Sequence, residues 1–227
     1  MEAQNNFEKD IIPTSGGDLE ITFIGHGTLM FSYNDLIIHV DPVTRYADYS
    51  KLPKGDLILI THQHGDHFSK EALDQITTPN TVTIITETVA KELEGGTVMK
   101  NWDTKSIKGL NILAVPAYNV VHKRDNGIPF HPKGEGNGYV LTFGNTKVYI
   151  GGDTENIPEM KDIPSVDVAF LPMNLPYTMT PEMVAAAARV LKPKILYPYH
   201  YGDTDTAELL NLMKNEKDTE VRIRNLK

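Results

Sequence analysis

Hydrophobic positions in the first 60 residues come in short runs separated by turn residues. Residues 19–24, 28–33 and 36–40 are rich in β-branched and aromatic side chains, and Gly25-His26-Gly27 separates the first two runs. This pattern predicts an antiparallel meander of short strands. Residues 56–60 carry a continuous apolar run instead, which is typical of a strand buried on both faces.

Helical patterns begin after this run. Residues 69–76 predict a helix with Ser69 as its N-cap, and residues 180–191 predict another, with Thr180 as cap and Pro181 at the first position. Asp205 and Glu208 form a capping-box pattern at the start of a helix over 205–215. A short helix is predicted at 88–93. Further strands are predicted at 82–86, 138–143, 147–150, 166–171 and 195–199, with short strands inside 98–115 and an edge strand at 221–223.

The two halves of the chain repeat one theme, a β-rich meander with inserted helices. We therefore predict an α+β fold, a four-layer αββα sandwich of two face-to-face sheets with helices outside. Residues 18–227 are expected to form a single domain, and residues 1–17 a loose polar N-terminal arm. The long, polar, Gly/Pro-rich stretch 119–137 is expected to be functional or mobile.

Composition narrows the chemistry. The chain has no cysteine, so any metal must be held by His, Asp or Glu. The net charge of −8 disfavours a nucleic-acid backbone as partner, but it leaves small anionic substrates open, because bound divalent ions reverse the local field. No apolar run approaches the roughly 20 residues of a membrane span. The chain as given is expected to be cytoplasmic, with a processed exported form as the alternative.

Four side chains of metal-ligand type follow the buried strand ending at residue 60. His62 and His64 are two apart and point the same way on an extended segment. Asp66 and His67 come just after Gly65, where the chain can turn sharply. Three solvated histidines are the alternative interpretation, but this density of ligands directly after an apolar strand favours a metal site.

Two later residues stand at predicted strand ends. Asp153 follows Gly151-Gly152 after the strand 147–150, and His200 follows the strand 195–199. Taken separately, Asp153 would be interpreted as a turn residue, and His200 as a histidine at a strand end that is satisfied by hydrogen bonds.

Together, the order His-x-His-x-Asp-His, Gly-Asp and a late strand-end His resembles the metallo-β-lactamase superfamily over residues 19–202. The resemblance implies two metals that share one bridging carboxylate. It implies His62 and His64 as first-metal ligands, Asp66, His67 and His200 as second-metal ligands, Asp153 as the bridge and Asp41 as a hydrogen-bonded support.

The chain departs from this family in one place. Another first-metal histidine is expected shortly after the strand that ends at Val115, but Asn119 stands there. His122 and His131 are the alternatives, both in the long loop. The first site is therefore weak, or uses a loop histidine, or is empty.

The segment Gly25-His26-Gly27-Thr28 resembles the branch of ascorbate-6-phosphate lactonase-like hydrolases. That resemblance implies that His26 lies beside the metals; the alternative is a turn histidine satisfied by backbone. Zinc is the expected metal, with manganese or iron as alternatives, and one or two ions are expected.

We therefore predict a metal-dependent hydrolase that uses a metal-bound hydroxide on a small-molecule lactone, ester or phosphodiester. Asp66 is expected to orient the water or take its proton, and His131, Lys133 or Tyr118 to protonate the leaving group or bind substrate. Residues 119–137 and 173–177 are expected to line the pocket. The alternatives are a nuclease, for which no basic cluster with aromatics is found, and a non-catalytic metal-binding module. Oligomeric state is left open.

Overall fold

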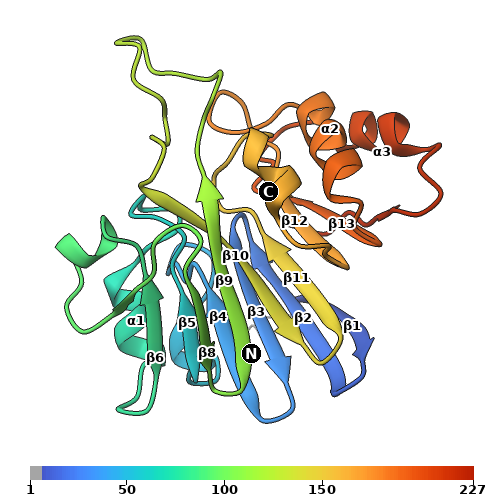
Figure 1. The fold of residues 1–227 in the computed structure, drawn as a ribbon. Helices are drawn as coiled ribbons and strands as arrows, with labels where there is room; N and C mark the ends of the chain where they lie inside the picture. The colour runs from blue at the N-terminus through green and yellow to red at the C-terminus, as the bar shows by residue number, and fades with distance from the viewer. Residues whose placement is uncertain (1–6) are drawn as a thin grey trace, which may run out of the picture.

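The computed structural model describes residues 7–227 as two seven-stranded sheets packed face to face (Figure 1). In each sheet the strands follow one another in sequence order. The first sheet holds β1 (Glu8–Thr14), β2 (Gly17–Gly25), β3 (Thr28–Tyr33), β4 (Leu36–Val40), β5 (Leu57–Leu59), β6 (Val82–Ile85) and β7 (Thr97–Val98). The second holds β8 (Thr104–Ile107), β9 (Leu110–Ala117), β10 (Gly136–Phe143), β11 (Thr146–Ile150), β12 (Val168–Pro172), β13 (Ile195–Tyr199) and β14 (Glu220–Val221).

Both sheets change from antiparallel to parallel pairing halfway across. Strands β1 to β4 are antiparallel and β4 to β7 parallel, and the second sheet repeats this with β8 to β11 and β11 to β14. Parallel strands place their carboxyl ends at one edge, where ligand sites of such sheets form. The segments after β4, β5, β11 and β13 therefore meet at one end of the sandwich.

Helices cover the outer faces. The apolar side of α1 (Lys70–Ile76) packs with η1 (Tyr49–Lys51) and η2 (Val89–Lys91) on the first sheet. Helices α2 (Pro181–Leu191) and α3 (Thr206–Met213) lie with η3 (Pro158–Asp162) on the second. The predicted αββα sandwich is thus confirmed. Within the described residues, no helix is long and apolar enough to cross a membrane.

The helices begin where the capping residues predict. Ser69, Thr180 and Asp205 accept hydrogen bonds from backbone N–H groups two or three residues on, which satisfies donors that a helix start leaves unpaired. The helix predicted at 88–93 is only the 3₁₀ turn η2.

The expectation of a loose polar arm over residues 1–17 is wrong for the part that the structure describes. Residues 8–14 form β1, an edge strand antiparallel to β2 with Glu8 opposite Phe23 and Thr14 opposite Gly17. An edge strand is half exposed and therefore contains many polar residues, so the hydrophobic pattern did not predict β1. Its residue Ile12 is nevertheless buried in the core. Residues 1–6 lie outside the described part.

Asp10 on β1 is clamped to the C-terminal segment. Arg224 Nη2 donates to both carboxylate oxygens of Asp10 at 2.8 Å, Arg222 Nη1 donates at 3.4 Å, and the Tyr197 hydroxyl also donates. Burial alone would raise the pKa of Asp10, but the bonds from Tyr197 and the two arginines outweigh it and lower that pKa below 3.8. The carboxylate therefore joins β1 to the C-terminal segment as a charged group.

Replacing Asp10 with asparagine is expected to lower the free energy of unfolding by about 2 kcal/mol, because charge-assisted hydrogen bonds are lost and two arginines lose their counter-charge. Urea unfolding at pH 7 measures this, with the exposed Asp18→Asn as matched control. The folded pKa is lowered, so the contribution is present above pH 4 and lost as the pH falls below the folded pKa. An unchanged transition midpoint for Asp10→Asn would contradict the clamp.

Candidate metal centre

The loop after β5 folds back on itself and gathers its polar side chains. The backbone N–H groups of His67 and Phe68 both donate to the His64 carbonyl at 2.9 Å, which closes the turn. Gly65 is not among the residues with positive φ, and a Cβ built on it would meet nothing within 4 Å. The sharp turn therefore does not depend on glycine freedom, contrary to the sequence-based expectation.

A first cluster joins three histidines and one carboxylate whose candidate ligand atoms lie within 4.8 Å of one another: His62, His64, His131 and Asp153. His64 Nδ1 is 3.1 Å from His62 Nε2 and 3.2 Å from His131 Nε2. His131 Nε2 is 3.1 Å from Asp153 Oδ2. Ligands at the usual zinc distances of about 2.0–2.2 Å around a tetrahedron are spaced by about 3.3–3.6 Å, close to the spacings in this cluster, so the cluster fits a divalent ion.

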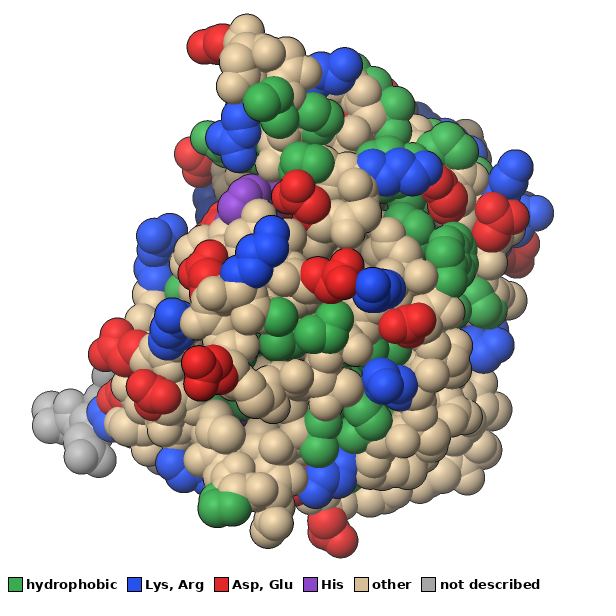
Figure 2. Space-filling view, turned by 60° about the vertical axis from the view of Figure 1, so that its left-hand side comes forward, with side chains coloured by type: hydrophobic (Ala, Val, Ile, Leu, Met, Phe, Trp, Pro, Cys, Tyr) green, Lys and Arg blue, Asp and Glu red, His purple; other side chains and the backbone are tan. Residues whose placement is uncertain are grey.

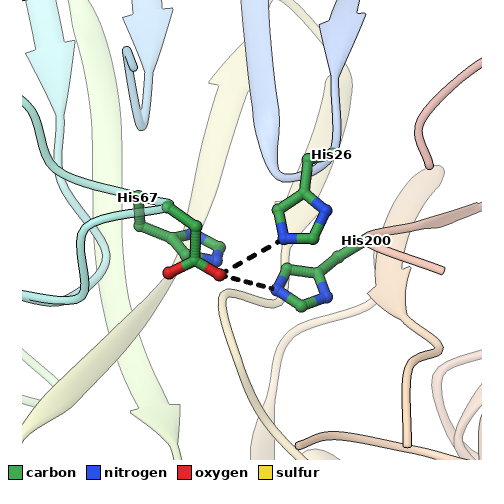
Figure 3. A group of neighbouring side chains, drawn as sticks. His26, His67 and His200 are labelled. Atoms are coloured by element: carbon green, nitrogen blue, oxygen red, sulfur yellow. Dashed lines mark hydrogen bonds and ion pairs between the residues drawn. The ribbon is translucent and has the colours of Figure 1, made fainter. Parts of the chain in front are cut away.

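A second cluster lies beside it and contains His26, Asp66, His67 and His200. Asp66 Oδ2 lies 3.3 Å from His26 Nε2 and 3.6 Å from His200 Nε2. In Figure 3, dashed lines from one carboxylate oxygen reach the labelled rings of His26 and His200, with the ring of His67 beside them. Asp153 reaches this cluster too, with Oδ1 3.2 Å from His67 Nε2 and Oδ2 3.4 Å from His200 Nε2. One buried carboxylate therefore contacts both clusters.

Several atoms facing the two clusters are buried without a hydrogen-bond partner, among them His67 Nε2, Asp153 Oδ1 and His200 Nε2. Such orphaned groups are costly unless something satisfies them. The donor set is nitrogen and oxygen only, which suits zinc, manganese or iron. The residues present therefore fit divalent cations.

The charge state of the side chains also suits cations. Burial, and then the neighbouring His67, lower the pKa of His62 well below 6.5. Burial likewise lowers the pKa of His26 and His64. Burial would raise the pKa of Asp153, but the histidines around it, His200 first, hold that pKa well below 3.8. Neutral imidazoles around a charged carboxylate are the forms that bind metal. His67 is the exception, because burial would lower its pKa but the carboxylates of Asp153 and Asp41 raise that pKa well above 6.5.

Asp41 supports the centre from behind. Its carboxylate is fully buried and accepts hydrogen bonds from the Thr61 N–H and the Thr61 hydroxyl, both at 2.7 Å. His67 Nδ1 lies 2.8 Å from Asp41 Oδ2. A proton on Nδ1 leaves His67 Nε2 free to face the site, which is the usual arrangement of a carboxylate behind a histidine ligand.

Backbone strain concentrates here. His26, Asp41 and His200 have φ values of 55°, 46° and 50°, in the left-handed region that side chains other than glycine seldom adopt. Each costs on the order of 1–3 kcal/mol. The His200 N–H donates to the His26 carbonyl at 3.1 Å, and this bond ties the β2–β3 turn to the end of β13. Gly27 is required beside them, because a Cβ there would lie 2.5 Å from His67 Cε1.

The loop histidine that joins the first cluster is His131. Asn119, at the position where a histidine was expected, accepts hydrogen bonds from the N–H and Nδ1 of His131 at 2.7 and 2.8 Å. His122 joins neither cluster and instead lies with Nδ1 2.6 Å from Glu155 Oε1. Sequence reasoning did not single out Glu155, although an acid two residues after Asp153 was a usable signal.

Tyr118 and Lys133 pair with Glu159 and with each other, not with residues of the two clusters. The Tyr118 hydroxyl donates to Glu159 Oε2 at 2.8 Å, and Lys133 Nζ donates to Glu159 Oε1 at 2.5 Å. Lys133 Nζ also lies 4.9 Å from the centre of the Tyr118 ring. Neither residue lines the cavity over the clusters, so the structure gives no support for a role of either in proton transfer.

A cavity of about 370 Å³ opens over the two clusters. Its lining combines residues of both clusters with Gly65, Arg124, Phe130 and Tyr177. Phe130 and Tyr177 meet edge to face at 5.1 Å, and the Arg124 guanidinium lies 5.1 Å from the centre of the Phe130 ring. The long loop, which rises beyond the sheet ends in Figure 1, and the segment 173–177 thus both contribute to the wall, as predicted.

Comparisons with known proteins agree with this geometry. Residues 20–200 match the profile of the family described as "Beta-lactamase superfamily domain". A curated relative from Methanoculleus marisnigri, named as a UPF0173 metal-dependent hydrolase, is 30% identical over 217 residues and covers 90% of this chain and 92% of its own. This chain therefore belongs to the metallo-β-lactamase superfamily. Within that class it is a metal-dependent hydrolase.

Two solved structures support the assignment. A protein from Parabacteroides distasonis assigned as a metal-dependent hydrolase is 50% identical, with a TM-score of 0.93 over 97% of this chain and 100% of that one. The metallo hydrolase Igni18 from Ignicoccus hospitalis is 24% identical, with a TM-score of 0.74 over 92% and 95% of the two chains. The second likeness is one of fold.

Proposed function

We propose that the protein hydrolyses a small anionic ester, lactone or phosphodiester, using divalent ions held by the two clusters, with zinc as the first choice and manganese or iron as alternatives. The observation that carries the proposal is the Asp153 carboxylate, shared between the clusters beneath a cavity of about 370 Å³. We assign His62, His64 and His131 to one ion, and Asp66, His67, His200 and His26 to the other. A carboxylate shared by two ions is typical of dinuclear hydrolases.

When bound, the ions would supply hydroxide near neutral pH and polarise a carbonyl or phosphoryl oxygen. The chain supplies the rest. Both carboxylates line the cavity, but Asp66 is the more exposed, with 34% of its side chain accessible against 3% for Asp153. Asp66 is therefore placed to take a proton from water on the cavity side, and His26 and His200 orient its Oδ2.

Arg124 supports an anionic substrate. It is the one Lys or Arg among the residues that line the cavity. Its guanidinium lies against the face of Phe130 and donates to the Phe130 carbonyl at 3.4 Å, a long bond that is the one hydrogen bond of this guanidinium within residues 7–227. A guanidinium binds carboxylate or phosphate with two parallel hydrogen bonds. The Phe130–Tyr177 pair offers an apolar wall beside it.

The size of the cavity and the charge distribution on the surface favour a small molecule over a polynucleotide as the substrate. A cavity of about 370 Å³ lies at the lower end of the usual range of small-molecule sites, about 300–1,000 Å³. On the face drawn in Figure 2, acidic and basic side chains are interspersed and form no continuous basic track. Phosphate-backbone binding needs such a track.

Replacing Arg124 with methionine is expected to raise KM about 10- to 100-fold for substrates that carry a carboxylate or phosphate, because a charge-assisted contact is lost. A panel of lactones, esters and phosphodiesters, with and without an anionic group, measures this in the metal-loaded enzyme. kcat is expected to change little. Arg189→Met, which removes a surface pair with Glu216, is the matched control. Equal KM changes for neutral and anionic substrates would contradict the role of Arg124, and no hydrolysis across the panel would contradict the proposed function.

A further inference from the structure

We propose that Glu155 is a positioning residue that builds the first metal site from a loop, acting through Asn119 on His131. The inference deepens the proposed function and rests on its assignment of an ion to the cluster of His62, His64, His131 and Asp153. It explains how a loop histidine can replace a histidine placed directly at a strand end.

Glu155 is fully buried, and its carboxylate is saturated with donors. Oε2 accepts from the N–H groups of Val120 and Val121 at 2.7 and 2.6 Å. Oε1 accepts from the His122 N–H at 2.8 Å and from Asn119 Nδ2 at 3.1 Å. Three consecutive backbone N–H groups thus wrap one carboxylate, which is the geometry of a backbone anion nest. The start of the loop is fixed by this one side chain.

Asn119 connects the start of the loop, which Glu155 fixes, to the candidate metal ligand His131. Its Nδ2 donates to Glu155 and also to the Tyr177 carbonyl at 2.8 Å, so the amide can present only its oxygen to His131. That oxygen accepts from His131 Nδ1, and the Asn119 N–H donates to the His131 carbonyl at 2.9 Å. A proton is therefore held on His131 Nδ1, and the lone pair of Nε2 faces His64 and Asp153.

The position of Glu155 in the chain restricts its movement, so that it can anchor the loop. Glu155 follows Asp153 by two residues, and its N–H donates to the Tyr118 carbonyl at 3.0 Å, next to the end of β9. The residue shared by both clusters and the anchor of the loop therefore stand on one short segment after β11. A ligand supplied by a loop must be held in place before the metal binds, or binding pays the entropy of ordering it.

Glu155→Gln tests the inference, because the amide has the same shape but turns an NH₂ group toward N–H donors. Binding of Zn²⁺ to the full-length metal-free protein is measured by competition with a chromophoric chelator. We expect the affinity for one of two ions to fall about 10- to 100-fold and that for the other to stay unchanged. Cobalt spectra of the variant should match those of His131→Ala and differ from those of His200→Ala. Glu159→Gln, which changes a nearby acid that bonds Tyr118 and Lys133, is the control.

The possible outcomes distinguish a failure of the Glu155–Asn119–His131 chain of hydrogen bonds, here called the relay, from a failure of the proposed function. Wild-type protein that binds fewer than two ions would overturn the dinuclear proposal itself. Wild-type protein that binds two ions while Glu155→Gln keeps both at full affinity would overturn only the relay. If Glu155→Gln fails to fold, Asn119→Ala decides, because it leaves the backbone bonds of Glu155 in place and removes the acceptor of His131. Unchanged affinity for both ions in Asn119→Ala would equally overturn the relay.

Discussion

Asp153→Asn is expected to lower kcat/KM by at least about 10³. Asp153 contacts His131 on one side and His67 and His200 on the other, and it is almost completely buried. An amide keeps the shape but loses the negative charge that both ions would share. Activity assays and elemental analysis of the same preparation measure the loss, and we expect less than one ion per chain.

The control for this prediction is Asp162→Asn, which changes an exposed aspartate on η3. It is expected to keep wild-type activity and metal content. Asp153→Asn protein that retains both ions and wild-type kcat/KM would show that the shared carboxylate is not the element that joins the two clusters.

The sequence predicted those parts of the centre that depend on short-range order. His62, His64, Asp66 and His67 follow a strand whose apolar run is unmistakable, and strand ends of a parallel sheet meet at one edge. Asp153 and His200 come after strands β11 and β13 for the same reason. Their assembly into two clusters therefore needed only the correct order of strands.

The first cluster could not be completed from sequence, because its last member depends on long-range hydrogen bonds. His131 lies twelve residues after Asn119, and its place is fixed by Asn119 and by a carboxylate 36 residues away from Asn119. No local pattern distinguishes His131 from His122, which is bound to Glu155 instead. Strand β1 escaped notice for a related reason, since Asp10 is satisfied by arginines more than 200 residues away.

The left-handed conformations of His26, Asp41 and His200 were equally hidden. Local sequence preference opposes them, and only the surrounding fold holds them in place. Such strain at a site is consistent with side chains being positioned for binding at some cost in stability. It is also why His26, which looks like an ordinary turn residue, contributes its ring to the second cluster.

Asp66→Asn is expected to lower kcat/KM by about 10² to 10⁴, the usual size of a lost proton-transfer group. Asp66 belongs to the second cluster and does not belong to the first. The ion that we assign to His62, His64 and His131 is therefore expected to stay, while affinity for the other ion falls. Metal content should drop by about one ion per chain, in contrast to the larger loss in Asp153→Asn.

Saturating metal separates the two roles of Asp66. If the carboxylate only binds an ion, excess Zn²⁺ should restore kcat in Asp66→Asn as the second cluster refills. If it also takes a proton from water, kcat stays low when both clusters are full. His26→Ala provides the comparison, because it removes a neighbour of Asp66 Oδ2 and leaves the carboxylate in place. We expect His26→Ala to be rescued by excess metal and Asp66→Asn not to be; full activity of Asp66→Asn with unchanged metal content would refute both roles, since the carboxylate would then neither hold an ion nor move a proton.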